Sequence, residues 1–292
     1  MTLASLINQF VSGLTFGMVL FLLALGLVLI FGVMRVVNFA HGSLYMVGAF
    51  LGYFVWDWSK DVTGSFWVSV IAAGLLVAAL GLVLEYMLRP LYAREHSDQI
   101  LFTYGCVLII GDLVKMLWGG QYRSLPRPAG FAGRLELGGV VLPTYYLLLI
   151  GVGIAAGLGL WLLLERTKLG RIIRAAVADR EMVGILGIRL PRLFASVFGI
   201  GAFLAGAAGL LAAPLGSIGT GMDVEIIVAV FAVAIVGGMG SFVGAALASL
   251  IIGEVYTFGI LILPQAAQVF MFLVMVVVLV VRPQGLMAPA RR

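Results

Sequence analysis

The segment ERTKLGRIIRAAVADREMVGILGIRLPR (residues 165–192) is the longest strongly charged stretch in a chain that is otherwise almost entirely apolar. It contains seven Lys or Arg residues and three acids, a local net charge of +4, and long apolar runs lie on both sides of it. Lys and Arg concentrate in the cytoplasmic loops of membrane proteins. We therefore place this segment on the cytoplasmic side of a membrane.

The spacing of apolar residues inside this segment predicts one short helix over residues 171–186. Small or apolar residues recur there at intervals of three, four and four, which stacks them on one helix face. The helix should end at Gly187, and Pro191 cannot continue a helix interior. Two interpretations stay open: the apolar stripe docks in a groove of a partner protein, or the segment is a solvated basic loop or lies on anionic lipid. The stripe consists of Ala175, Ala178, Met182 and Leu186.

Composition places the whole chain in the class of all-α polytopic membrane proteins. Hydrophobic residues make up 63% of it and charged residues 11%, whereas soluble domains carry roughly 25% charged residues. Glycine is abundant, and GxxxG pairs, which favour close helix contacts, occur at residues 13 and 17, 48 and 52, and 153 and 157. We predict about eight membrane segments, at residues 9–31, 39–56, 65–84, 100–118, 145–164, 193–215, 240–263 and 265–281.

The distribution of Lys and Arg predicts the orientation. With the amino terminus outside, 13 of these residues fall on the inner side, Arg291 and Arg292 among them, and 4 fall on the outer side. Residues 216–225 then form an outer loop, and the carboxyl terminus is inside. Residues 226–238 are too short to cross a bilayer, so residues 226–263 should form a broken or re-entrant helix pair. Irregular backbone at that depth lines protein or a water-filled path, which makes these glycines candidate pathway residues: Gly237, Gly238, Gly240 and Gly244.

Three further polar sites are candidates for the pathway. Asn38 precedes the second span and is expected to cap it, with His41 and Gly42 following in its first turn. A buried histidine can relay protons or bind a ligand, or it can simply pack or cap. Glu254 is the one acid between residues 226 and 281, and it either faces the pathway or reaches the outer interface.

The sequence offers no chemistry of its own to drive transport. It has no GxxxxGK[ST] phosphate loop, its two histidines lie 55 positions apart, and its single cysteine is Cys106. We therefore expect no catalytic residue, no metal site, no cofactor and no nucleic-acid partner. Ion-coupled carriers commonly place ionisable groups near the midplane, and few exist here. A permease driven by a separate ATPase is the simplest scheme; the alternatives are an ion-coupled secondary transporter of a small solute and a channel-like pore subunit.

Three blocks of sequence resemble a known family, the transmembrane permease subunits of ABC importers for branched-chain amino acids, of the LivH type. They are VNFAHGSLYMVGA (residues 37–49), RAAVADREMVGILGI followed by FGIGAFLAGAAGLLAAPLG (174–188 and 198–216), and VGGMGSFVGAALASLIIG (236–253). The sequence departs from the EAA motif of many ABC importers, because Ala176, Val177 and Ala178 precede Asp179. Only the LGI portion and the position of the loop are similar.

The resemblance implies one permease domain over residues 1–292, working in a bacterial inner membrane as part of a larger complex. Its expected partners are a second homologous permease, two cytoplasmic ATPases that bind the ATP, and a periplasmic solute-binding protein. Related permeases import urea, short amides or aromatic acids, so the solute stays open. The residues expected to couple this chain to the ATPases are Ala175, Ala178, Asp179, Met182, Leu186 and Gly187.

Overall fold

The computed structural model describes residues 3–62, 64–92, 94–137 and 139–287 of the chain. Within these residues, seven helices are long and apolar enough to cross a membrane. The expected all-α polytopic membrane protein is therefore confirmed, and the predicted count of about eight segments is close. Arg291 and Arg292, which the charge count assigned to the inner side, lie outside the described residues.

The helices follow the predicted apolar runs, because segments of this kind satisfy every backbone group internally when they form helices. The 20-residue helix α2 is not among the seven, and the 16-residue helix α9 extends roughly 24 Å at about 1.5 Å per residue, less than a bilayer core of about 30 Å. The helices are α1 (Leu3–Met34), α2 (Ala40–Ser59), α3 (Ser65–Leu88), α4 (His96–Trp118), α5 (Thr144–Arg166), α6 (Lys168–Ala178), α7 (Arg180–Ile185), α8 (Leu190–Ala212), α9 (Met222–Gly237), α10 (Phe242–Ile262) and α11 (Ala267–Val281).

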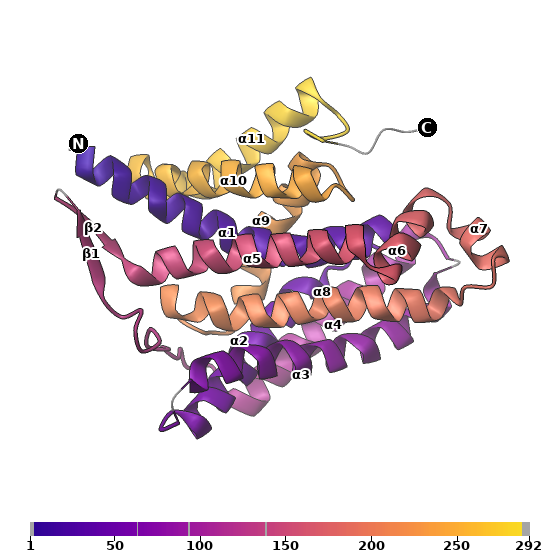
Figure 1. The fold of residues 1–292 in the computed structure, drawn as a ribbon, viewed down its shortest axis with the longest axis horizontal. Coiled ribbons are helices and arrows are strands. Elements are labelled where there is room, and N and C mark those ends of the chain that lie inside the picture. The colour runs from indigo at the N-terminus through magenta and orange to yellow at the C-terminus, as the bar shows by residue number, and fades with distance from the viewer. Residues whose placement is uncertain (1–2, 63, 93, 138, 288–292) are drawn as a thin grey trace. The chain divides into compact units, whose positions relative to one another are not determined.

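Contacts divide the chain into two compact units, of which one comprises Leu25–Leu125 and Gly157–Ile227. In this unit α2, α3 and α8 pack against one another and α4 packs against α2, so the four lie side by side (Figure 1). The helices approach closely at small residues. A methyl group added at Gly206 of α8 would lie 2.6 Å from Cβ of Val77 in α3, and Gly48 of α2 contacts Gly206 directly. The predicted close contact at the second GxxxG pair is confirmed.

The other unit comprises Met1–Ala24, Pro126–Ala156 and Val228–Arg292. Here the first part of α1 packs against α10: the rings of Phe16 and Tyr256 stack with centroids 4.8 Å apart, and Gly17 lies against the Ser249 carbonyl. A two-stranded antiparallel hairpin, β1 (Arg134–Leu137) and β2 (Val140–Pro143), precedes α5 (Figure 1). The long loop before the fifth span thus carries a small structure of its own.

Candidate functional site

The charged segment at residues 165–192 contains two helices, α6 and α7, in place of the one predicted. The prediction of a single helix over residues 171–186 is wrong, because Asp179 adopts an extended backbone (φ −153°, ψ 102°) between α6 and α7. Its carboxylate accepts a hydrogen bond from the Met182 N–H at 3.0 Å and so caps α7. Aspartate is among the strongest helix N-caps, and here this preference outweighs the apolar spacing that favoured one helix.

The predicted coupling residues are distributed over both helices and are exposed. Ala175 and Ala178 lie in α6, and the Met182 side chain in α7 is 52% exposed. Leu186 follows α7 and is 72% exposed, next to Ile185 at 79%. Gly187, with φ +84°, lies just beyond the end of α7, and the helix ends there as predicted. Between these exposed apolar side chains, Val183 is buried, and its carbonyl accepts a hydrogen bond from the Ile188 N–H at 3.3 Å.

Arg180 connects α7 to the end of α1. Its guanidinium donates a hydrogen bond to the Met34 carbonyl at 3.4 Å. Burial lowers the pKa of Arg180, and the neighbouring charge of Arg35 lowers it further. Arg35 itself has φ +54°, a left-handed conformation that is unusual for a residue other than glycine. The two arginines therefore lie together where α1 ends and the turn into α2 begins.

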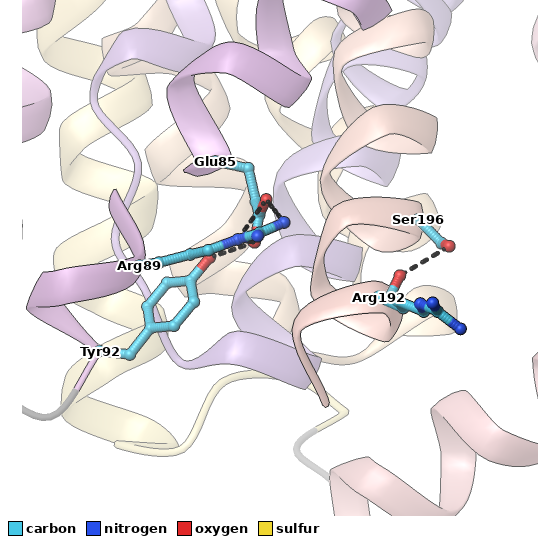
Figure 2. Close-up of polar contacts among 5 residues, drawn as sticks. All are labelled: Glu85, Arg89, Tyr92, Arg192 and Ser196. Atoms are coloured by element: carbon cyan, nitrogen blue, oxygen red, sulfur yellow. Dashed lines mark hydrogen bonds and ion pairs between the residues drawn. The ribbon is translucent and has the colours of Figure 1, made fainter. Parts of the chain in front are cut away.

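An ion pair between the buried Glu85 carboxylate and the partly exposed Arg89 lies at the end of α3 and was not identified from the sequence. The Glu85 carboxylate is fully buried and accepts hydrogen bonds from Arg89 (Nη2 to Oε2, 2.8 Å) and from the Tyr92 hydroxyl (2.9 Å), as Figure 2 shows. Burial and the nearby Glu85 charge raise the pKa of Tyr92, so its hydroxyl keeps its proton and can donate. The Tyr92 ring meets Phe194 of α8 edge-on at 5.2 Å. This cluster fastens α3 to the first turns of α8.

Asn38, His41 and Gly42 lie together in a buried polar region at the start of α2. The expected capping role of Asn38 is wrong, because Phe39 occupies the N-cap and makes no side-chain cap bond. Asn38 and His41 are 1% and 0% exposed, and the His41 ring lies against Gly26 of α1. Gly42 contacts the Asp223 carbonyl of α9, and a methyl group at Gly42 would lie 2.8 Å from Cβ of Ile227.

Asp223 completes this polar region and corrects a further expectation. Residues 216–225 were expected to form an outer loop, but α9 begins at Met222, and Asp223 is only 4% exposed. The Ser43 hydroxyl donates a hydrogen bond to the Asp223 carboxylate at 3.0 Å. No local pattern relates two residues that lie 180 positions apart, so sequence analysis could not find this pair. By contrast, the i, i+4 spacing of Glu85 and Arg89 was a readable signal.

The predicted break between α9 and α10 is confirmed. Gly238 and Gly240 have φ of +98° and +92°, values that glycine adopts without strain. Across the turn, Gly237 and Gly244 are in backbone contact, and the Ser241 hydroxyl caps α10 by accepting from the Gly244 N–H at 3.1 Å. The segment after α11 folds back here, since the N–H groups of residues 286 and 287 donate to the carbonyls of residues 236 and 237.

Glu254 lies in α10 against Gly13 of α1, where the absence of a side chain at Gly13 makes room for its carboxyl group. Both carboxyl oxygens are shielded from solvent and have no hydrogen-bonding partner among the residues that the structure describes. One helical turn further along, the Gln9 side chain donates to the Thr257 carbonyl. Whether Glu254 faces a pathway remains a prediction. In the described ranges, no three His, Cys, Asp or Glu side chains are grouped so that they could hold a metal ion.

Comparisons with known proteins agree with this architecture. Residues 9–279 match the family model described as the permease component of the branched-chain amino acid transport system. The chain is 30% identical to the high-affinity branched-chain amino acid transport system permease protein BraD of Pseudomonas aeruginosa, and 27% identical to the corresponding LivH protein of Escherichia coli K12. Each alignment covers 96% of this chain and 95% of the relative. No solved structure gives a significant match. The chain therefore belongs to the family of branched-chain amino acid transport system permease components.

Proposed function

We propose that this chain is the translocation subunit of an ATP-driven importer in a bacterial inner membrane. It carries branched-chain amino acids, or a related small polar solute, that a periplasmic binding protein delivers. The relatives that align over almost their whole length are named as permeases of such systems. In this scheme the chain has no catalytic site and no cofactor, because two partner ATPases bind and hydrolyse ATP. A second, homologous permease completes the membrane path.

One observation supports the ATPase docking site above all others. α7 and the residue after it present three exposed apolar side chains, Met182, Ile185 and Leu186, within a segment that has a net charge of +4. Exposed apolar side chains that cluster within a polar rim are typical of protein interaction sites. The docking mode is a short helix whose apolar side enters a groove on the ATPase. Ala175, Ala178, Asp179 and Gly187 then shape and flank this contact.

The docked helix can act on the membrane helices through contacts that are already present. Gly184 of α7 faces the side chain of Leu190, the first residue of α8. The Glu85, Arg89 and Tyr92 cluster fastens the same end of α8 to α3. Movement of α7 therefore reaches α8 and α3 together. Asn38, His41, Gly42, the glycine turn at 237–244 and Glu254 are proposed to line or hinge the solute path.

A pair of substitutions at Leu186 tests the docking site. Fully burying a leucine is worth about 1.5 to 3 kcal/mol, and a carboxylate buried without a partner costs several kcal/mol more. Leu186→Asp should therefore abolish both copurification of the ATPases and leucine uptake, whereas Leu186→Met should preserve both. The variants should insert into the membrane equally, because this side chain lies outside the spans.

The outcome separates the proposal from its main alternative. If Leu186→Asp retains ATPase and uptake, α7 is a solvated or lipid-facing element and the docking site lies elsewhere. If no ATPase copurifies with the unmodified protein, and uptake follows a proton or sodium gradient, the chain is an ion-coupled secondary transporter.

A further inference from the structure

The first turns of α2 and α9 meet at a buried polar region. Asn38, His41 and Ser43 come from α2 and the turn before it, and Asp223 comes from α9. None is more than 4% exposed. Gly42 makes the meeting possible, because any side chain there would collide with Asp223 and Ile227.

Asn38 has unused hydrogen-bonding capacity, and the Asp223 carboxylate has no cationic partner among the described residues. Neither the Nδ2 nor the Oδ1 atom of Asn38 has a hydrogen-bonding partner among the described residues. The buried Asp223 carboxylate accepts a hydrogen bond from the Ser43 hydroxyl, and no Lys or Arg forms an ion pair with it within the described ranges. An unpaired buried amide, or a carboxylate without a cation, is costly in a protein interior. Each such group in a native structure calls for an explanation, such as a functional role or a bound ion or water.

The unsatisfied atoms specify the chemistry of that ligand. A carboxylate and an amide oxygen accept hydrogen bonds from an ammonium group, while an amide N–H₂ donates to a carboxylate. The start of a helix also favours negative charge, and Asn38 lies two residues before the first residue of α2. A molecule that carries an ammonium and a carboxylate on one carbon matches both requirements.

We infer that Asn38, Ser43 and Asp223 form a transit site for the zwitterionic head group of an α-amino acid. This inference rests on the proposed import function and narrows its substrate class, since urea and simple amides carry no ammonium group. The Asp223 carboxylate and the Asn38 Oδ1 atom receive the ammonium, and the Asn38 Nδ2 atom donates to the carboxylate. The apolar side chain of the substrate is then free to lie against apolar helix surface.

The site is closed in this structure, so the substrate reaches it only when the two first turns separate. Two hydrogen bonds join the chain just before Asn38 to other helices of the unit. The Thr103 hydroxyl of α4 donates to the Val37 carbonyl, and Arg180 of α7 donates to the Met34 carbonyl. The second bond joins the last residue of α1, four residues before Asn38, to the proposed ATPase-docking helix. Movement of α7 on ATPase docking is therefore transmitted through this hydrogen bond towards the transit site.

Transport stoichiometry tests this inference in the complete complex, reconstituted with its ATPases and a saturating amount of binding protein. Asp223→Asn and Asn38→Leu should each lower the leucine imported per ATP hydrolysed at least tenfold, while the rate of ATP hydrolysis stays within twofold of wild type. The control is Ser69→Ala, a buried serine of α3 whose hydroxyl bonds to its own helix at Ser65. It should leave both quantities unchanged.

A second measurement does not depend on stoichiometry. In a Cys106→Ser background, Ser43→Cys should react during turnover with a small ammonium-bearing thiol reagent, and leucine should slow that reaction at least fivefold. The inference is overturned if both site variants keep the wild-type ratio of leucine to ATP, or if leucine gives no protection. Failure of the proposed function looks different: the wild-type complex then imports no branched-chain amino acid with ATP.

Discussion

The contact between Gly237 and Gly244 gives a quantitative prediction about the break between α9 and α10. A methyl group added at Gly237 would lie 2.5 Å from the carbonyl carbon of Gly244 and 2.7 Å from the backbone nitrogen of Ala245. Ordinary carbon contacts need about 3.5 Å, so the two helix ends must separate by roughly 1 Å. The obstacle is backbone and cannot rotate away.

The expected cost of Gly237→Ala follows from two opposing terms. Overpacking a tight contact costs about 1 to 3 kcal/mol, and replacing a helical glycine by alanine returns about 0.5 to 1 kcal/mol. We therefore expect a net loss of about 1 to 2 kcal/mol, which lowers the melting temperature of a chain this size by about 2 to 6 °C. The matched control is Gly105→Ala in α4, where no atom lies within 4 Å of the added methyl group. That variant should be as stable as wild type or slightly more stable.

The assay is thermal unfolding of the purified protein in detergent, followed by size-exclusion chromatography, together with leucine uptake. Gly237→Ala should unfold earlier than the control and import leucine more slowly. Equal melting temperatures for the two variants would refute the close packing of α9 on α10. They would also remove the structural reason for treating this turn as a fixed feature of the path.

Three further predictions concern the Tyr92 hydrogen bond, the Arg180 contact and the orientation of the chain in the membrane. Tyr92→Phe removes a hydrogen bond to a buried carboxylate and should destabilise the protein by about 1.5 to 3 kcal/mol. Because the pKa of Tyr92 is raised, melting experiments should show this loss of stability from about pH 6 to about pH 9, and it should disappear only at higher pH. A stability difference that vanished below about pH 9 would argue against the hydrogen bond. Arg180→Gln should reduce leucine uptake more than Arg171→Gln, because Arg180 contacts the Met34 carbonyl whereas Arg171 is exposed. Equal leucine uptake by the two variants would mean that the contact with Met34 is irrelevant to transport. In a Cys106→Ser background, and in cells with an opened outer membrane, an impermeant maleimide should label Gly120→Cys and Gly216→Cys, because both positions have open space around them. The same reagent should not label Glu181→Cys, and labelling there would contradict the predicted orientation of the chain in the membrane.

The sequence allowed the membrane helices and the break after α9 to be predicted because both depend on local composition. Long apolar runs form helices in lipid wherever they occur. The cluster of glycines at 237–240 carried the information for a turn, and the structure places positive φ values at Gly238 and Gly240. The apolar residues of α7 were also foreseeable, since the uncharged run MVGILGI (residues 182–188) lies between the charged residues of this segment.

Tertiary contacts determine the features that were missed or wrong. Asp179 divides α6 from α7 because its carboxylate caps the second helix, and this capping preference competed with the apolar spacing that favoured one helix. Gly42 lets α9 approach α2 closely, and this approach buries the Asp223 carboxylate. No sequence pattern near residue 223 indicates its contact with Ser43. Asn38 resembled a helix cap by position, yet the chain begins α2 one residue later.

The source of energy for transport tests the central claim most directly. The complex of this chain with its copurifying ATPases is reconstituted into liposomes, with ATP enclosed and the binding protein and radiolabelled leucine outside. We predict that uptake requires both enclosed ATP and the binding protein, and that it continues when ionophores abolish proton and sodium gradients. Uptake without ATP that stops when the gradients collapse would contradict the assignment of this chain as the permease of an ATP-driven importer.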